Sequence, residues 1–189
     1  MRMDSGSVSS VLVVCTANRC RSVMAQAMLT HKLGVTAQVD SAGLLEPGLP
    51  PPPETVATMA RYGLEVARHR SRTVTAGQLK SADLVLAMAR EHVRHSVVTE
   101  PSVWPRTFTL KELLRRGGQL GPRKPSESLG AWLARVHAGR ERSALLGGSP
   151  EDDVADPVGG PPRAYTLAAA ELDRLVAELA ELGWPSPKS

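Results

Sequence analysis

A short run of β-branched residues near the start of the chain most restricts the fold. It spans Ser9–Cys15, reads SSVLVVC, and shows no alternation of polar and apolar residues. A strand of this kind is buried on both faces, which is typical of parallel sheets covered by helices. A polar stretch over 16–21 follows it, and the helical pattern over 22–33 ends before Gly34. The opening of the chain therefore predicts a strand, a polar loop and a helix.

The remaining pattern alternates between short apolar strands and amphipathic helices. Strands are expected at 36–41, 82–88 and 103–109, and helices at 54–62, 75–80, 90–98, 110–116 and 162–182. This alternation predicts an α/β fold with right-handed crossovers. The length of 189 residues predicts a single domain over 1–189. Residues 1–8 form a polar tail, and the Gly-, Ser- and Arg-rich stretch 117–150 is interpreted as an insertion or lid, with a helix expected over 129–138.

Composition excludes several classes of protein. Hydrophobic residues make up 42% and charged residues 22% of the chain, which is ordinary globular usage rather than that of a disordered chain. Aromatic residues make up only 3%, which argues against a protein that stacks single-stranded nucleic acid. The net charge of +4 mildly favours anionic ligands. No apolar stretch reaches the roughly 18 residues of a membrane span, so we expect a cytoplasmic protein without a membrane or nucleic-acid partner.

The two cysteines, Cys15 and Cys20, lie at the junction between the first strand and the first helix. A loop at this junction turns backbone N–H groups inward as an anion nest, and the helix adds the positive end of its dipole. A cysteine in that field should exist largely as the thiolate. Arg21 offers a planar fork that matches two phosphate oxygens, and Ser22 can donate to the sulfur. These residues predict phosphoryl transfer through a cysteinyl phosphate, which needs no metal or cofactor.

Such a reaction also needs a general acid that protonates the leaving oxygen and then a general base that activates water. The sequence offers a cluster of carboxylates for this role. They are Glu151, Asp152, Asp153 and Asp156. Asp156 precedes Pro157, which stiffens the chain and favours Asp156 as the acid. Spacing alone leaves open a solvated acidic turn in which Asp156 only caps the last helix.

Five segments, in order, resemble the low-molecular-weight protein tyrosine phosphatases. They are VLVVCTANRCRSVMAQ at 11–26, DSAG at 40–43, HRSR at 69–72, ADLVLAMAREH at 82–92 and DVADPVGG at 153–160. The resemblance covers roughly 11–182, with 117–150 as an apparent insertion. It implies a three-layer, flavodoxin-like domain of the phosphatase I type, with a four-stranded parallel sheet flanked by helices.

The resemblance also implies roles for individual residues. Cys15 resembles the nucleophile, Arg21 the phosphate-binding arginine and Asp156 the general acid. The phosphate loop comprises Thr16, Ala17, Asn18, Arg19, Cys20, Arg21 and Ser22. The hydrogen-bonding set that shapes it comprises Asn18, Ser22, Ser41 and His69. The other histidines, which are His31, His92, His95 and His137, are interpreted as structural.

Cys20 matches the family's second cysteine, and two interpretations of it stay open. It could act as a redox partner that traps oxidised Cys15 as a disulfide and protects it from over-oxidation. It could equally be a small residue that only packs the loop.

The segments also depart from the family pattern at the expected substrate wall. Val158 stands where the family has an aromatic residue after Asp-Pro, the 43–53 loop carries no aromatic residue, and Arg19 replaces a small or apolar residue. Flat aromatic walls normally hold a phosphotyrosine ring. The leading hypothesis is a protein-tyrosine-phosphatase that acts on a phosphorylated protein and binds inorganic phosphate or another oxyanion in the loop. A protein-arginine phosphatase and a thiol-dependent arsenate reductase on the same scaffold are the alternatives.

Overall fold

The computed structural model describes residues 8–185 as alternating strands and helices. The strands are β1 (Ser9–Cys15), β2 (Ala37–Gly43), β3 (Leu84–Ala87) and β4 (Thr107–Thr109). The α-helices are α1 (Arg21–Leu33), α2 (Pro53–Ala60), α3 (Ala76–Ser81), α4 (Arg90–Thr99), α5 (Leu110–Leu120), α6 (Leu129–His137) and α7 (Pro162–Gly183). Three short 3₁₀ helices are η1 (Gly34–Thr36), η2 (Pro101–Arg106) and η3 (Arg142–Leu145).

The four strands form one parallel sheet in the order β2-β1-β3-β4. In the register of β1, Val13 lies beside Ser41 of β2 on one side and beside Leu86 of β3 on the other. Because all strands run in one direction, the loops that follow them meet at the same edge of the sheet. The predicted α/β domain with a four-stranded parallel sheet flanked by helices is confirmed.

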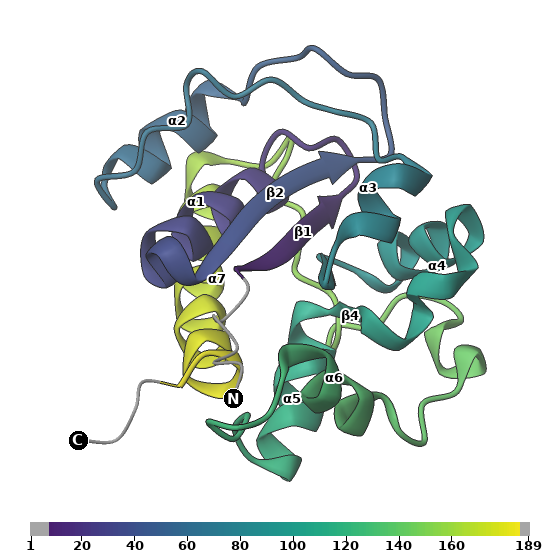
Figure 1. Ribbon diagram of the computed structural model, residues 1–189. Coiled ribbons are helices and arrows are strands. Elements are labelled where there is room, and N and C mark those ends of the chain that lie inside the picture. The colour runs from purple at the N-terminus through teal and green to yellow at the C-terminus, as the bar shows by residue number, and fades with distance from the viewer. Residues whose placement is uncertain (1–7, 186–189) are drawn as a thin grey trace.

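Helices cover both faces of the sheet, with α1 and α7 on one side and α3 and α4 on the other (Figure 1). Val11 and Val13 of β1 belong to the core under α1 and α7. Their neighbours Leu12 and Val14 pack with Leu79 of α3 on the opposite face. This alternation explains why β1 is apolar over residues 11–14. None of the helices described between residues 8 and 185 combines the length and apolarity needed to cross a membrane.

Two predicted elements differ from the observed ones near β4. The strand expected over 103–109 begins only at Thr107, because Pro101 and Pro105 lack the N–H that a ladder needs and the chain forms η2 instead. The helix expected to end at 116 continues to Leu120 as α5. Gly117 does not stop this helix but makes room for a neighbour, since a Cβ there would lie 3.0 Å from the ring of Trp132.

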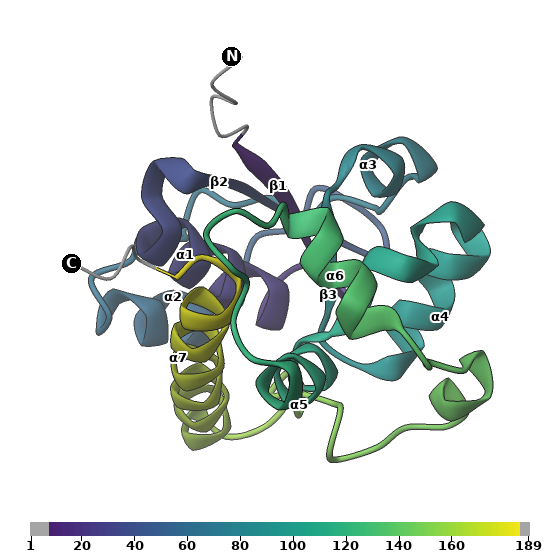
Figure 2. The same ribbon diagram turned by 60° about the horizontal axis from the view of Figure 1, so that its bottom comes forward.

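The stretch 117–150 is packed into the domain through α6 and the segment after it. Trp132 of α6 is 0% exposed and belongs to the core formed with α1 and α7. After α6, Arg140 donates to both carboxylate oxygens of Glu112 at 2.7 and 2.8 Å. Its guanidinium carbon lies 4.0 Å from the ring centroids of both Trp104 and Phe108. The buried ion pair and these aromatic contacts fix the segment against α5 and η2. Figure 2 shows α6 beside α5.

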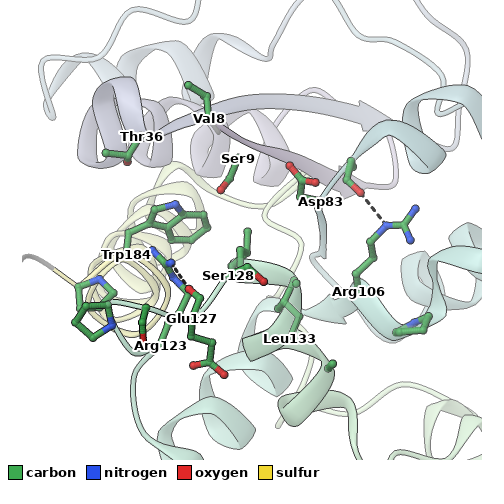
Figure 3. Close-up of a pocket in the computed structure, with 18 of the residues that line it drawn as sticks. Val8, Ser9, Thr36, Asp83, Arg106, Arg123, Glu127, Ser128, Leu133 and Trp184 are labelled. Carbon is green, nitrogen blue, oxygen red and sulfur yellow. Dashed lines mark hydrogen bonds between the residues drawn. The ribbon is translucent and has the colours of Figure 1, made fainter. Parts of the chain in front are cut away.

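A groove of about 1220 Å³ lies where the strands begin. Its lining includes Ser9, Thr36, Asp83 and Arg106, which stand at or just before the starts of the four strands (Figure 3). Leu133 of α6 also lines it. Since α6 borders this groove, α6 lies at the opposite end of the sheet from the loops that follow the strands.

Candidate active site

The loop between β1 and α1 lies at the carboxyl edge of the sheet. Cys15 is the last residue of β1, and α1 begins at Arg21. Asn18 has a φ of 51°, the one positive φ of a non-glycine residue between 8 and 185. A left-handed residue inside such a loop turns neighbouring N–H groups to one side, which is the geometry of an anion nest.

Gly43 at the end of β2 sets how closely the loop approaches the sheet. A Cβ on Gly43 would lie 2.7 Å from the backbone N of Asn18, 2.8 Å from the carbonyl O of Thr16 and 2.9 Å from the carbonyl C of Ala17. These are backbone atoms, so no side-chain rotation could relieve the clash. Only glycine fits between β2 and the loop.

A chain of hydrogen bonds directs the Ser22 hydroxyl to Cys15. Asn18 Nδ2 donates to Ser22 Oγ at 2.9 Å, and Ser22 Oγ lies 3.0 Å from Cys15 Sγ. Because Ser22 accepts from Asn18, the hydroxyl proton is free to point at the sulfur. A donor at this position stabilises a thiolate more than a thiol.

Asn18 is held from four directions. Its Nδ2 also donates to Ser41 Oγ at 2.8 Å, and Ser41 in turn donates to Gln26 Oε1 at 2.6 Å. Its Oδ1 accepts from the backbone N of Arg72 at 2.9 Å, and its carbonyl O accepts from His69 Nε2 at 2.8 Å. Burial lowers the pKa of His69, so at neutral pH its ring is uncharged and donates through Nε2. These contacts lock the strained residue in place.

Arg21 lies buried beneath the loop and contacts a distant part of the chain. Its side chain is 6% exposed, and Nη2 donates to Asp156 Oδ2 at 2.6 Å and to Thr16 Oγ1 at 3.1 Å. Nη1 donates to the carbonyl O of Val154 at 3.1 Å. Arg21 thus joins the phosphate loop to the loop before α7.

Two of the candidate carboxylates have structural partners. Asp152 is buried and accepts from Arg115 at 2.6 Å and from Arg90 at 2.7 Å. Burial alone would raise the pKa of Asp152. Hydrogen bonds from the two arginines outweigh this effect and hold the pKa below its usual range. Asp153 accepts from the backbone N of Arg90 at 2.8 Å and of Ser149 at 2.9 Å. Both carboxylates are engaged in shaping the segment.

Asp156 differs from them in its exposure and in its partner. Its side chain is 42% exposed, and among the residues that the structure describes its carboxylate accepts, besides Arg21, from the backbone N of Val158 alone, at 3.2 Å. Asp156 therefore combines contact with the buried arginine and access to solvent, which a group that exchanges protons with a ligand requires.

Cys20 lies on the buried side of the loop. Cys15 and Cys20 are both free thiols and both buried. Burial raises the pKa of Cys20 to about 12, against the smaller opposing effect of Thr55. Cys20 is therefore a neutral thiol at physiological pH.

One neighbour of the loop was not predicted as part of the site. His92 of α4 is 0% exposed, and its Nε2 lies 3.0 Å from Thr16 Oγ1. Burial, with a smaller contribution from Arg21, lowers the pKa of His92 to about 3. The sequence held one signal for this contact, because His92 lies in the helix that follows a strand adjacent to β1, and such helices begin at the same edge of the sheet.

The entrance of the site is framed by polar and aliphatic residues. Arg19 donates through Nε to the carbonyl O of Pro50 at 2.7 Å, which joins the loop to the 43–53 connection. Val158 is 50% exposed beside Asp156. The carboxyl edge formed by these loops is seen beyond the arrowheads of β1 and β2 in Figure 1.

The structure brings the predicted site residues together from segments far apart in the sequence. Cys15, Ser22, Asn18, Ser41 and His69 form one hydrogen-bonded group, and Arg21 links the loop to Asp156. Among the residues described from 8 to 185, no three His, Cys, Asp or Glu side chains are grouped as metal ligands.

Comparison with known proteins places this site in a family. Residues 10–119 match the family described as low molecular weight phosphotyrosine protein phosphatase. A probable low molecular weight protein-tyrosine-phosphatase of Ralstonia solanacearum is 36% identical over 107 residues, which cover 56% of this chain and 73% of that protein. A protein-arginine-phosphatase of Geobacillus stearothermophilus is 30% identical over 172 residues, which cover 90% of this chain and 93% of that protein.

A solved structure extends the similarity to the whole fold. The low molecular weight protein tyrosine phosphatase from T. tengcongensis superposes with a TM-score of 0.68 at 32% identity, covering 92% of this chain and 98% of the other. The family match spans more than half of the chain and includes the loop from Cys15 to Ser22. The chain therefore belongs to the low molecular weight protein tyrosine phosphatase family of cysteine-dependent hydrolases.

Proposed function

We propose that this protein hydrolyses phosphate monoesters of phosphorylated proteins through a phosphorylated Cys15. The observation that carries the proposal is the convergence of three groups at one loop. Cys15 Sγ contacts the Ser22 hydroxyl, Arg21 lies buried beneath the loop, and Asp156 reaches Arg21 from the far end of the chain. Together they supply a nucleophile, an anion clamp and a proton donor.

In the proposed reaction, the phosphate binds against the N–H groups of the loop and the guanidinium of Arg21. Cys15 Sγ attacks phosphorus as the thiolate, and the bond to the leaving oxygen breaks. Asp156 donates a proton to that oxygen. In the second step Asp156 takes a proton from water, the water attacks phosphorus, and Cys15 leaves as the thiolate that Ser22 stabilises.

The substrate proposed first is protein phosphotyrosine, in keeping with the family. A second candidate, protein phosphoarginine, is favoured by two observations. The relatives that match about nine-tenths of the chain include a protein-arginine-phosphatase. In addition, neither the 43–53 connection nor the Asp156-Pro157-Val158 segment carries an aromatic residue that could hold a tyrosine ring.

One comparison of substrates tests the proposal. Turnover is measured on p-nitrophenyl phosphate and on peptides carrying phosphotyrosine, phosphoserine or phosphoarginine, with arsenate plus a small thiol as a further arm. We expect hydrolysis of the aryl phosphate and a clear preference for the phosphotyrosine peptide. Preference for phosphoarginine would assign the second candidate, and reduction of arsenate without ester hydrolysis would contradict the proposal.

Replacement of Asp156 by alanine should slow turnover in proportion to the basicity of the leaving group. General-acid catalysis contributes about 10²–10⁴-fold, so an alkyl phosphate should lose on the order of that factor and an activated aryl phosphate much less. Asp152→Ala and Asp153→Ala are the matched controls, since their carboxylates bind Arg90, Arg115 and backbone N–H groups. They should reduce stability without the dependence on leaving group, and the reverse pattern would reject Asp156 as the acid.

Peroxide treatment should convert Cys15 to a disulfide with Cys20 at a rate that rises with pH. Cys15 sulfenic acid and the Cys20 thiolate would give the disulfide and hydroxide. Because the pKa of Cys20 is raised to about 12, its thiolate fraction is small at neutral pH and grows about tenfold for each pH unit. Mass spectrometry at pH 6.5, 7.5 and 8.5 measures disulfide against sulfinic acid. Cys20→Ser is the control, and a disulfide yield independent of pH would contradict this role.

A further inference from the structure

His92 is buried directly behind the phosphate loop, and the polar contacts that its ring makes with the described residues all run through Nε2. Nε2 lies 3.0 Å from Thr16 Oγ1 and 3.3 Å from Glu91 Oε1. Nδ1 is buried and has no hydrogen-bond partner among residues 8–185. A fully buried imidazole with polar neighbours on one side alone can form few hydrogen bonds. The neighbouring groups therefore determine which ring nitrogen carries the proton.

The neighbours favour a proton on Nε2. A protonated Nδ1 would be a buried donor with no acceptor, which folded proteins avoid more strictly than an unused acceptor. It would also leave the lone pair of Nε2 facing the carboxylate of Glu91. With the proton on Nε2, His92 donates towards Thr16 Oγ1, and Glu91 is the second acceptor nearby.

Thr16 is the point at which this donor meets Arg21. Thr16 Oγ1 also accepts from Arg21 Nη2 at 3.1 Å. A hydroxyl oxygen has two lone pairs, so the two donors fill them, while the Thr16 hydroxyl itself donates to Glu91 Oε1 at 3.4 Å. The two shorter contacts direct both lone pairs and so fix the orientation of the hydroxyl. The backbone of Thr16 is fixed as well, because its carbonyl O accepts from the N of Leu44 at 2.6 Å and of Leu45 at 3.2 Å.

The contact between His92 and Thr16 matters most when the carboxylate of Asp156 moves away from Arg21. Within residues 8–185, Arg21 donates to three acceptors, which are Thr16 Oγ1, Val154 O and Asp156 Oδ2. In the proposed reaction Asp156 moves its carboxyl group to the leaving oxygen. Thr16 and Val154 then remain to hold the plane of the guanidinium, and a threonine hydroxyl that rotates freely would hold it poorly.

We propose that His92 is a positioning residue, which fixes the Thr16 hydroxyl as an acceptor and thereby aligns Arg21 with the phosphate. His92 acts through Thr16 and touches neither substrate nor the reacting atoms. This role deepens the proposed phosphatase function and rests on it, because aligning Arg21 matters only where an oxyanion binds in the loop.

A matched pair of substitutions isolates the hydrogen bond. His92→Gln places an amide N–H near the position of Nε2, whereas His92→Met has similar length and volume without a donor. We expect the Gln variant to stay near the wild type. The Met variant should lose about three- to tenfold in kcat/KM and in affinity for orthovanadate, the fold-change expected for one neutral hydrogen bond.

The same contact is tested from its other side. Thr16→Ser keeps the hydroxyl and Thr16→Val removes it, so we expect the Val variant to lose more kcat/KM and more orthovanadate affinity than the Ser variant. The difference between these two variants should match the difference between His92→Met and His92→Gln. In the Thr16→Val background, His92→Met should cause little further loss, because both changes interrupt one path. The Thr16 pair keeps the test open if His92→Met does not fold.

Equal behaviour of the Gln and Met variants, or of the Ser and Val variants, would overturn the proposal. Full additivity in the double variant would overturn it as well, since it would show that His92 acts elsewhere. Titration with orthovanadate requires no turnover. If the wild type hydrolyses no phosphate ester, the proposed function fails, while the binding comparison still decides whether His92 aligns Arg21 on an oxyanion.

Discussion

Replacement of Cys15 by serine is expected to abolish phosphatase turnover while the fold stays intact. Loss of a covalent nucleophile typically lowers the rate by on the order of 10⁶-fold. The serine hydroxyl stays protonated at neutral pH and is a poor nucleophile, although it is close in size to the thiol. It can keep the contact with Ser22 Oγ that Cys15 Sγ makes at 3.0 Å. Turnover of p-nitrophenyl phosphate measures the loss.

The control for Cys15→Ser is binding without catalysis. The loop N–H groups and Arg21 remain in the variant, so orthovanadate or inorganic phosphate should still bind, and the melting temperature should stay near that of the wild type. Appreciable turnover by a well-folded Cys15→Ser protein would contradict the assignment of Cys15 as the nucleophile.

Replacement of Arg21 by lysine should be nearly as damaging as replacement by alanine. The guanidinium donates in three directions at once, to Thr16, Val154 and Asp156. A lysine ammonium is a point charge without the planar fork, so it cannot hold these contacts and two phosphate oxygens together. Removing one donor that stabilises a transition state costs about 10²–10³-fold, and we expect at least this loss in kcat/KM for both variants.

The same chemical change elsewhere should be harmless. The side chain of Arg174 on α7 is 65% exposed and forms an ion pair with Glu178, so Arg174→Lys is the matched control. If Arg21→Lys kept most of the activity, positive charge alone would suffice, and the bidentate clamp would be wrong.

The sequence predicted those parts of the molecule that depend on neighbouring residues. The strand Ser9–Cys15 was expected at the observed bounds, and α1 begins one residue from its expected start. Both follow from local apolar pattern, and the loop between them follows from their junction. The prediction that a strand begins at residue 103 was wrong, and the reason lies in the sequence itself. Pro105 interrupts the ladder of hydrogen bonds, so the strand begins at Thr107.

Contacts between distant segments could not be predicted in the same way. Spacing left Asp152, Asp153 and Asp156 as rival acids, because what separates them is contact with Arg90 and Arg115 from other helices. The sequence alone favours a structural role for His92, because a lone histidine is more often a satisfied structural residue, and its place after a strand adjacent to β1 is a weak signal. Its contact with Thr16 joins residues 76 positions apart and depends on how α4, packed on β3 and β4, meets the loop after β1.

The close fit of Gly43 against the backbone of the loop means that some positions of the site tolerate substitution and others do not. At this position every side chain meets backbone atoms at less than 3.0 Å, so mutation cannot adjust the floor of the site in small steps. The rim carries no such restriction, because Val158 is 50% exposed and Arg19 is partly exposed and contacts the carbonyl O of Pro50 through its side chain. A library that randomises all three positions should return glycine alone at 43 and many residues at 19 and 158. Lineages with this architecture can therefore change the phosphorylated group they accept while inheriting the chemistry of its removal unchanged.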